Sequence, residues 1–253
     1  MSGILLKTPS EIKIMAEGGK KLGRVKKALM DKVREGVSAK EIDDLADELI
    51  KKEGGEASFK MVPGYHWATC VNVNDGVVHG IPKEEIVFKK GDVVSVDVGM
   101  FYKGFHTDTS FTVGLGVIKE INKFLDTGKD ALKKAIQEAK GGKKIFDVSE
   151  AIESTLKQSG YSPIRALVGH GVGRDLHEEP KIPCFTTGEA SSSPEIPEVA
   201  VLAIEVMYAM GAGEVKLDED GWTILASDGT ISGLFEETVA VTKNGSIVLT
   251  GIS

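Results

Sequence analysis

The feature that most constrains the fold is an order of patterns that occurs twice: two helical segments followed by a series of short strands. Apolar residues recur at helical spacing after Thr8 and again after Ser38, and each of these residues opens a capping box. Residues 57–113 then alternate as strands do, most clearly at 93–98 and 105–113.

The second occurrence spans about 118–250. Its helices are expected at about 118–140 and from a capping box that begins at Asp147 to Gly160, before strands dominate again. Placing Gly54 on Gly160 aligns the second helix of each set at an offset of 106. The alignment is weak evidence by itself, because two amphipathic helices can be slid into register. The repeated order therefore carries the prediction of two similar halves.

Composition excludes several classes of protein. The chain has 253 residues, 41% of them hydrophobic, which is enough to bury a large core without disulfides. Its net charge of −7 disfavours general binding to nucleic acids or membrane surfaces, because their phosphates would repel it. Two cysteines and no targeting or membrane-spanning pattern predict a cytoplasmic protein. Without a linker, we expect one domain, 1–253, with halves at about 8–113 and 118–250.

Several carboxylates occur inside strands that are otherwise apolar, where an unpaired charge costs several kcal/mol or becomes protonated. Asp97 and Asp108 flank a hairpin. If that hairpin turns at Tyr102-Lys103, the two carboxylates lie directly opposite each other and repel unless a cation separates them. Glu205 interrupts the apolar run 199–207. These positions predict a cation site.

Two further acids and a histidine extend this set. Glu236 and Glu237 precede an apolar strand, and only one of them can face inward because neighbours on a strand point to opposite faces. His170 lies among glycines that permit close backbone approach or positive φ, whereas His66 and His106 are interpreted as structural. Two aspartates, two glutamates and one imidazole suit a pair of Mn, Fe, Co or Zn ions, whose charge balances four carboxylates.

Long motifs in a fixed order carry a resemblance. They are residues 72–82 (NVNDGVVHGIP), Asp97-Val-Gly99 with Asp108-Thr-Ser110, and residues 169–180 (GHGVGRDLHEEP). The chain resembles the type I methionine aminopeptidases of the creatinase/aminopeptidase superfamily, in metallopeptidase family M24. The resemblance implies an α+β pita-bread fold, in which two pseudo-symmetric halves surround a curved antiparallel sheet.

The resemblance also implies the chemistry of the site. Glu205 would accept the proton of the attacking water, His177 would stabilise the tetrahedral intermediate, and His79 would contact the scissile amide nitrogen. The pocket for the methionine side chain would use aromatic and sulfur-bearing residues, and a Na or K ion would lie near two polar residues. The implied ligands of two divalent ions are Asp97, Asp108, His170, Glu205 and Glu236, of which Asp108 and Glu236 bridge the ions. The implied methionine pocket is formed by Phe59, Tyr65, Cys70 and Trp222. The implied monovalent-cation residues are Asn74 and Ser232.

The implied reaction is removal of the initiator methionine, preferably when the second residue is small. Its partners would be the N-termini of nascent polypeptides, with transient association with the ribosome, no nucleic-acid specificity and no membrane. The resemblance implies a monomer.

Departures from the family pattern concern substrate preference and metal affinity. Val206 stands where proline usually follows the ligand glutamate, and Leu176 replaces an aromatic residue before His177. Glu237 stands where histidine is common and is expected to add a negative charge near the site. The segment 63–67 differs from the usual pocket loop.

Two other interpretations stay open. An aminopeptidase or dipeptidase acting on X-Pro bonds belongs to the same superfamily, and comparing Met-Ala-Ser with an X-Pro peptide separates the two. A catalytically inactive homologue that serves as a binding module is expected to have lost metal ligands, whereas this chain retains all five.

Overall fold

The structure is a computed structural model that describes residues 3–252. Its helices in this range are α1 (Pro9–Lys32), α2 (Ala39–Lys52), α3 (Lys119–Glu138) and α4 (Ile145–Gln158), with short 3₁₀ helices η1 (Ser58–Met61) and η2 (Ala190–Ser192). Its strands there are β1 (Glu56–Ala57), β2 (Thr69–Val73), β3 (Gly76–Val78), β4 (Val93–Tyr102), β5 (Phe105–Gly114), β6 (Ser162–Pro163), β7 (Val168–Gly171), β8 (Glu178–Pro183), β9 (Val201–Ala209), β10 (Val215–Leu217), β11 (Ile224–Ala226), β12 (Ser232–Thr242) and β13 (Gly245–Val248).

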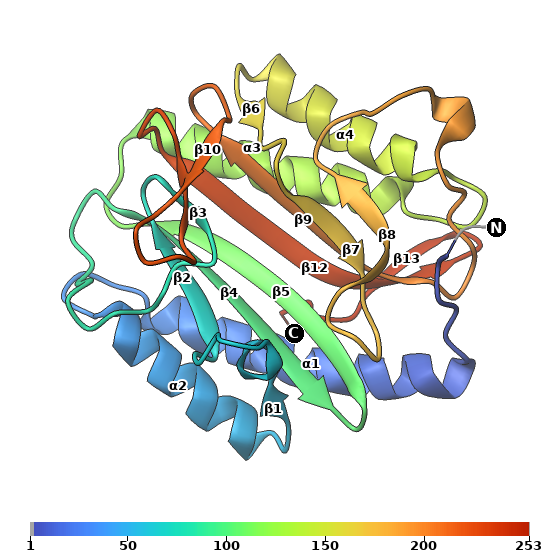
Figure 1. Ribbon diagram of the computed structural model, residues 1–253, viewed down its shortest axis with the longest axis horizontal. Helices are drawn as coiled ribbons and strands as arrows, with labels where there is room; N and C mark the ends of the chain where they lie inside the picture. Colours follow the sequence, from blue (N-terminus) through green and yellow to red (C-terminus); the bar gives the residue numbers. More distant parts are fainter. Residues whose placement is uncertain (1–2, 253) are drawn as a thin grey trace.

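A curved antiparallel sheet forms the centre of the molecule, in the order β1-β4-β5-β12-β9-β7-β8 (Figure 1). Strand β2 pairs with β4, β6 with β9 and β13 with β12, while β10, β11 and β3 form a small separate sheet. Helices α1 and α2 pack on one half of the central sheet, and α3 and α4 pack on the other half. This arrangement agrees with the expected α+β class.

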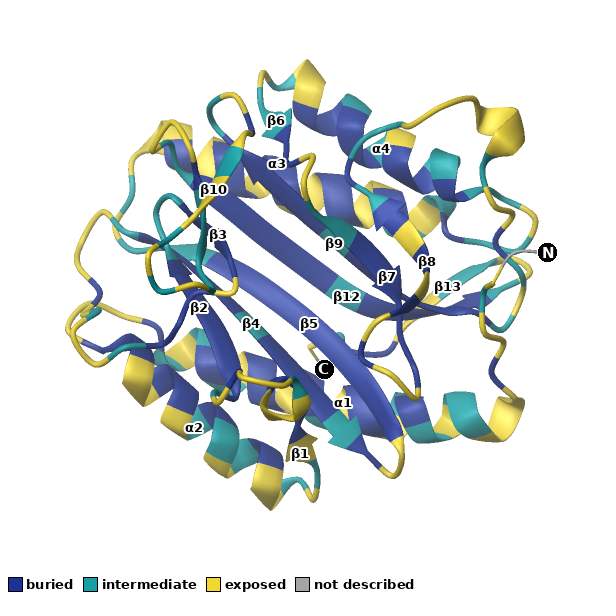
Figure 2. Cartoon of the chain, viewed as in Figure 1, coloured by how far each residue is buried: buried dark blue, intermediate teal, exposed yellow. Residues whose placement is uncertain are grey.

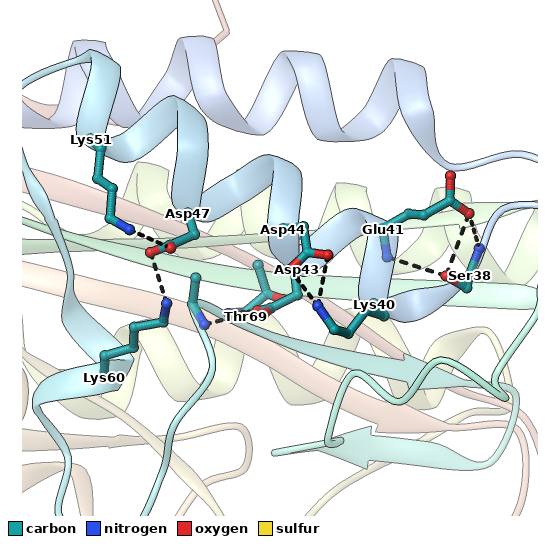
Figure 3. A network of polar contacts seen from close by, with 10 residues as sticks. Ser38, Lys40, Glu41, Asp43, Asp44, Asp47, Lys51, Lys60 and Thr69 are labelled. Atoms are coloured by element: carbon teal, nitrogen blue, oxygen red, sulfur yellow. Dashed lines mark hydrogen bonds and ion pairs between the residues drawn. The ribbon is translucent and has the colours of Figure 1, made fainter.

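The helices begin where side chains can satisfy free backbone amides. Thr8 Oγ1 accepts from the amide of Glu11, while Glu11 Oε2 accepts from the amide of Thr8 at 2.7 Å. Ser38 and Glu41 make the same reciprocal pair before α2 (Figure 3). The predicted start of α4 was wrong by two residues: Asp147 lies in its first turn and accepts from the amide that precedes the helix.

The offset of 106 residues relates both the first and the last residues of the two shorter helices, α2 and α4. Helices α2 and α4 have 14 residues each, and they begin at 39 and 145 and end at 52 and 158. The apolar residues that the offset aligns are fully buried in both helices. They are Ile42 with Val148, Ala46 with Ile152, and Ile50 with Leu156.

The two faces of the central sheet bury different chemistry. Val94, Val96 and Val98 of β4 pack in the core beneath α1 and α2, and alternate residues of β9 and β12 pack beneath α3 and α4. The central strands are consequently buried along most of their length, whereas exposed residues lie on outer helix faces and loops (Figure 2). The opposite face of the sheet is left free to carry polar groups.

The hairpin register differs from the expected one. Lys103 and Gly104 form the turn, both with positive φ (49° and 90°), so that Tyr102 pairs with Phe105. A two-residue turn of this type matches the twist of the strands. Asp97 therefore lies opposite Ser110, and Asp108 lies diagonally from it on the same face.

Among residues 3–252, no helix combines the length and the apolar character that crossing a bilayer requires.

Candidate metal centre and active site

Five neighbouring strands of the central sheet each contribute one of the predicted metal ligands. In the order β4, β5, β12, β9 and β7, the residues are Asp97, Asp108, Glu236, Glu205 and His170. Their side chains line one cavity.

Register brings the acidic side chains together. Glu205 pairs directly with Glu236 across β9 and β12, and Glu236 pairs with Ser110, next but one to Asp108. Ligand atoms of Asp108, His170 and Glu236 all lie within 4.8 Å of one another. Like charges directly opposed on a sheet destabilise it unless a cation lies between them. The cluster thus has the geometry of a metal site.

Burial and mutual repulsion shift the acids towards their protonated forms. Burial, followed by a contribution from Asp108, raises the pKa of Glu205 to about 8, and burial raises the pKa of Asp108 to about 7. The pKa values of Asp97 and Glu236 are raised well above the usual range for the same reasons. Asp97 Oδ1 and Glu236 Oε1 are buried without a hydrogen-bond partner. Unpaired buried oxygens of this kind fit a divalent ion.

His170 is prepared as a neutral ligand. Its Nδ1 donates to the carbonyl oxygen of Gly171 at 2.9 Å, which leaves Nε2 free, 4.0 Å from Glu205 Oε1. Burial lowers its pKa to about 3. A neutral imidazole with one nitrogen fixed by a hydrogen bond is the form that binds a metal ion.

The glycines around His170 act through close backbone approach, not through positive φ. A Cβ at Gly169 would lie 2.8 Å from the carbonyl oxygen of Ala203, and one at Gly171 would lie closer still to that of Glu179. Neither glycine has a positive φ. The strand that carries the ligand can therefore pack tightly between its neighbours.

The carboxylates lie in a cavity of about 310 Å³ with aromatic and aliphatic walls. Every predicted pocket residue lines it: Phe59, Tyr65, Cys70 and Trp222. The sequence analysis missed seven apolar residues that line the cavity. Met207 could have been predicted among them, because it lies two positions after Glu205 and therefore on the same face of β9. The missed residues are Val62, Val78, Ala166, Leu167, Val168, Leu176 and Met207.

Tyr65 organises the aromatic wall. Its ring packs edge-on against Trp67 and Trp222, with centroids at 5.2 and 5.1 Å, and its hydroxyl donates to the carbonyl oxygen of Thr69 at 2.9 Å. Burial, followed by the charge of Asp97, raises the pKa of Cys70 well above its usual value. Cys70 therefore lines the pocket as a thiol and not as a nucleophilic thiolate.

Helix α2 fixes this wall from outside (Figure 3). Asp43 Oδ1 accepts from the amides of Ala68 and Thr69 and from the Thr69 hydroxyl, all at 2.8–2.9 Å. Asp47 pairs with Lys60 of η1 at 2.8 Å. The segment that presents Phe59 and Cys70 to the cavity is consequently held at both ends by one helix.

Two predicted histidines lie at the mouth of the cavity. His79 and His177 both line it while remaining exposed. Desolvation of each ring by the surrounding chain lowers the pKa of both imidazoles. The ring of His177 lies 4.4 Å from that of His170, centroid to centroid. His106 does not line the cavity, and its Nδ1 lies 2.9 Å from Ser58 Oγ.

A buried ion pair holds the loop that carries His177. Lys7 pairs with Glu178, and both side chains are 2% exposed. Glu178 also accepts from the amide of Asp175 at 3.3 Å. A Cβ at Gly173 would overlap with the side-chain ends of both members of this pair, so any larger residue there would displace the pair. The N-terminal segment thereby fixes the position of His177.

Lys7→Met is expected to lower the free energy of unfolding by about 3–5 kcal/mol, because it leaves Glu178 buried without its partner. Thermal unfolding of the purified protein measures the loss. Arg174→Met, which breaks the exposed pair between Arg174 and Glu11, is the matched control and should cost less than about 1 kcal/mol. Equal melting temperatures for the two variants would contradict a role for burial.

The expectation that Glu237 adds a negative charge near the site holds in part: after burial and the other acids, the charge of Glu237 contributes to the raised pKa of Glu236, but the Glu237 side chain does not line the cavity. Glu236 faces the cavity, and Glu237 points to the opposite face of β12, as strand alternation requires. There Glu237 pairs with Lys26 of α1 at 2.6 Å. Sequence reasoning missed Lys26 because only the tertiary fold brings it next to β12.

Asn74 and Ser232 lie together outside the cavity. The amide of Ser232 donates to the carbonyl oxygen of Asn74 at 2.8 Å, and its hydroxyl donates to that of Gly76 at 2.6 Å. Asn74 has a positive φ of 56°. Polar oxygens are thus gathered where a monovalent cation was predicted.

Comparison with known proteins places these features in a family. Residues 13–243 match metallopeptidase family M24. The chain is 38% identical over 250 residues to methionine aminopeptidase 1 of Bacillus subtilis, a match that spans 98% of this chain and 100% of that protein. It is 39% identical over 248 residues to the methionine aminopeptidase of Clostridium perfringens, a match that spans 98% of each protein.

Solved structures agree. Methionine aminopeptidase from Thermotoga maritima matches with a TM-score of 0.95 and 39% identity over 98% of this chain and 99% of that one. Prolidase from Pyrococcus furiosus shares the fold, with a TM-score of 0.78 and 22% identity over 98% of this chain and 66% of that one. These likenesses confirm the predicted pita-bread fold. The chain belongs to metallopeptidase family M24.

Proposed function

We propose that this chain is a methionine aminopeptidase that removes the N-terminal methionine of peptides and nascent proteins, preferably when the second residue is small. One observation carries the proposal: five potential metal ligands from five neighbouring strands line the same cavity as an apolar, aromatic and thiol-bearing wall. Such a wall suits a flexible thioether. The relatives named above support the same activity.

The donor set fits two divalent ions of Co, Mn, Fe or Zn, which Asp97, Asp108, His170, Glu205 and Glu236 would hold. Bound there, the ions would polarise the scissile carbonyl and acidify a water molecule. Four carboxylates and a neutral imidazole match their charge and their preference for oxygen and nitrogen ligands.

The protein's own groups complete the chemistry. Glu205 accepts the proton from the attacking water. His177 donates to the oxygen on which negative charge develops, and His79 contacts the scissile amide nitrogen and assists its protonation. Both histidines lie at the mouth, where the peptide chain must leave the cavity. Asn74 and Ser232 would bind a Na or K ion that stiffens the nearby loop.

A substrate of this kind sets the partners. We propose a cytoplasmic monomer that acts on nascent polypeptide N-termini during transient association with the ribosome, without nucleic-acid or membrane specificity.

A metal-titrated peptide panel tests the function. Protein freed of metal and then supplied with Mn, Co or Fe should cleave Met-Ala-Ser, should cleave Met-Leu-Ser at least about tenfold less efficiently, and should leave Ala-Ala-Ser intact. An X-Pro dipeptide is the comparison substrate. Preference for the X-Pro bond would replace the proposal with a proline-specific peptidase, and metal binding without cleavage of any peptide would favour a binding module.

A further inference from the structure

The ion pair of the buried Lys26 and the half-buried Glu237 lies on the reverse face of the sheet from the proposed metal centre. Lys26 belongs to α1, which packs against β5 (Figure 1), and its side chain is 3% exposed. Its Nζ lies 2.6 Å from Glu237 Oε1 and donates to Thr109 Oγ1 at 2.9 Å. Other buried residues of α1 at this level, such as Val25 and Leu29, are apolar. A buried ion pair rarely stabilises a fold more than apolar residues of the same size, so its presence calls for another role.

One branch of hydrogen bonds leads from Lys26 to the ligand Glu236. Thr109 Oγ1 accepts a hydrogen bond from Lys26 Nζ, and the hydroxyl proton of Thr109 is donated to the carbonyl oxygen of Glu236 at 2.8 Å. The amide of Thr109 donates to Asp108 Oδ1 at 3.0 Å. Without the ammonium group, the Thr109 proton can turn to Glu237 Oε2 at 3.3 Å, and the Glu236 carbonyl loses its donor.

A second branch leads from Glu237 to the ligand Asp108. The Thr250 hydroxyl donates to Glu237 Oε2 and accepts from the amide of Thr238 at 3.0 Å. Thr238 Oγ1 in turn accepts from the amide of Asp108 at 2.9 Å and donates to its carbonyl oxygen at 2.8 Å. The two branches thus reach two of the proposed metal ligands, Glu236 and Asp108.

We propose that Lys26 and Glu237 are positioning residues for the metal centre: through Thr109 and Thr250 they fix the spacing of Asp108 and Glu236 from the reverse face of the sheet. This inference rests on the proposed function for the identity of the ligands. Fixed outer partners orient metal ligands and tighten metal binding, typically by 10–100-fold. The pair itself touches neither the substrate nor the ions.

Binding of Co(II) alone to the metal-free protein tests this role. Isothermal titration gives the dissociation constants, and the visible absorption of bound Co(II) reports its coordination. Thr109→Val, which removes one hydroxyl, is expected to weaken the less tightly bound ion at least about tenfold and to change the spectrum. Lys26→Met should do the same. Combining the two substitutions should add less than about twofold, because Lys26 acts through Thr109.

Further variants separate positioning from stability. Thr109→Ser keeps the hydroxyl and should restore Co(II) binding to within about twofold of the wild type. Lys26→Met with Glu237→Gln removes both charges of the pair, so that it should regain melting temperature without regaining Co(II) affinity. Glu153→Gln, on α4, is the control: Glu153 accepts from Thr186 and does not line the cavity, so the variant loses a buried carboxylate contact but keeps the affinity.

Each outcome decides a different statement. Unchanged Co(II) affinity and spectrum in Thr109→Val and Lys26→Met would overturn the positioning role, as would full additivity of the two. If the wild type binds only one Co(II), the two-metal proposal fails, and the same variants still decide whether Lys26 positions the ligands of that ion.

Discussion

Glu205→Gln is expected to reduce the turnover of Met-Ala-Ser by about 10²–10⁴-fold, because glutamine cannot accept the proton of the attacking water. The side chain keeps its size, and a buried carboxylate is removed from a cluster of four, so the fold should persist. Steady-state kinetics at saturating metal measure the loss, and metal analysis of the same sample separates it from loss of an ion. Glu48→Gln, at an exposed position of α2, is the matched control.

Full turnover by Glu205→Gln with both ions bound would remove Glu205 from its role as base. A loss of turnover that more metal restores would leave it a ligand only.

The metal-free protein is expected to lose stability as the pH rises from 7 to 8. In the folded state the pKa values of Asp108 and Glu205 are about 7 and about 8, whereas unfolded carboxyl groups titrate near 4. The folded state therefore holds protons that the unfolded state has released, and stability falls with rising pH. The loss is about 1.4 kcal/mol per pH unit for each such proton, or roughly 3–6 °C in melting temperature.

Between pH 7 and pH 8, the change in stability comes from the clustered carboxylates and not from the buried histidines or from acids with lowered pKa values. Buried histidines such as His170, with a pKa of about 3, are neutral in the folded state, and above pH 7 they are mostly neutral in the unfolded state as well. Acids with lowered values, such as Glu153 and Asp220 at about 2, are ionised throughout.

Divalent metal should reverse the loss. Two ions at a hundredfold excess over their dissociation constants add about 5 kcal/mol, because they bind only the folded state. Calorimetry at pH 7 and pH 8, with and without metal, measures both effects. Metal-free Glu205→Gln should be more stable than the wild type at pH 8 and should have a shallower dependence on pH. A melting temperature independent of metal would show that the cluster is not a binding site.

The sequence determined those features that depend on neighbouring residues. The capping boxes at Thr8 and Ser38 mark where α1 and α2 begin, since a cap acts within four residues. Alternation along β12 required that Glu236 and Glu237 face opposite ways. A charged residue inside an apolar strand, such as Glu205, indicated that a cation from outside the strand must neutralise it.

Only the tertiary structure decided which distant groups meet. The turn at Lys103-Gly104 set the register that placed Asp97 opposite Ser110, and one residue of difference at a turn changes every cross-strand pair. Lys26 and Glu237 are 211 residues apart in the chain, and Lys7 and Glu178 are 171 apart. Such pairs form because the tertiary fold brings two distant segments together, and no local pattern encodes where they meet. The sequence by itself thus predicted which residues are metal ligands, whereas the tertiary structure decided that they line one cavity and which residues contact them from the reverse face of the sheet.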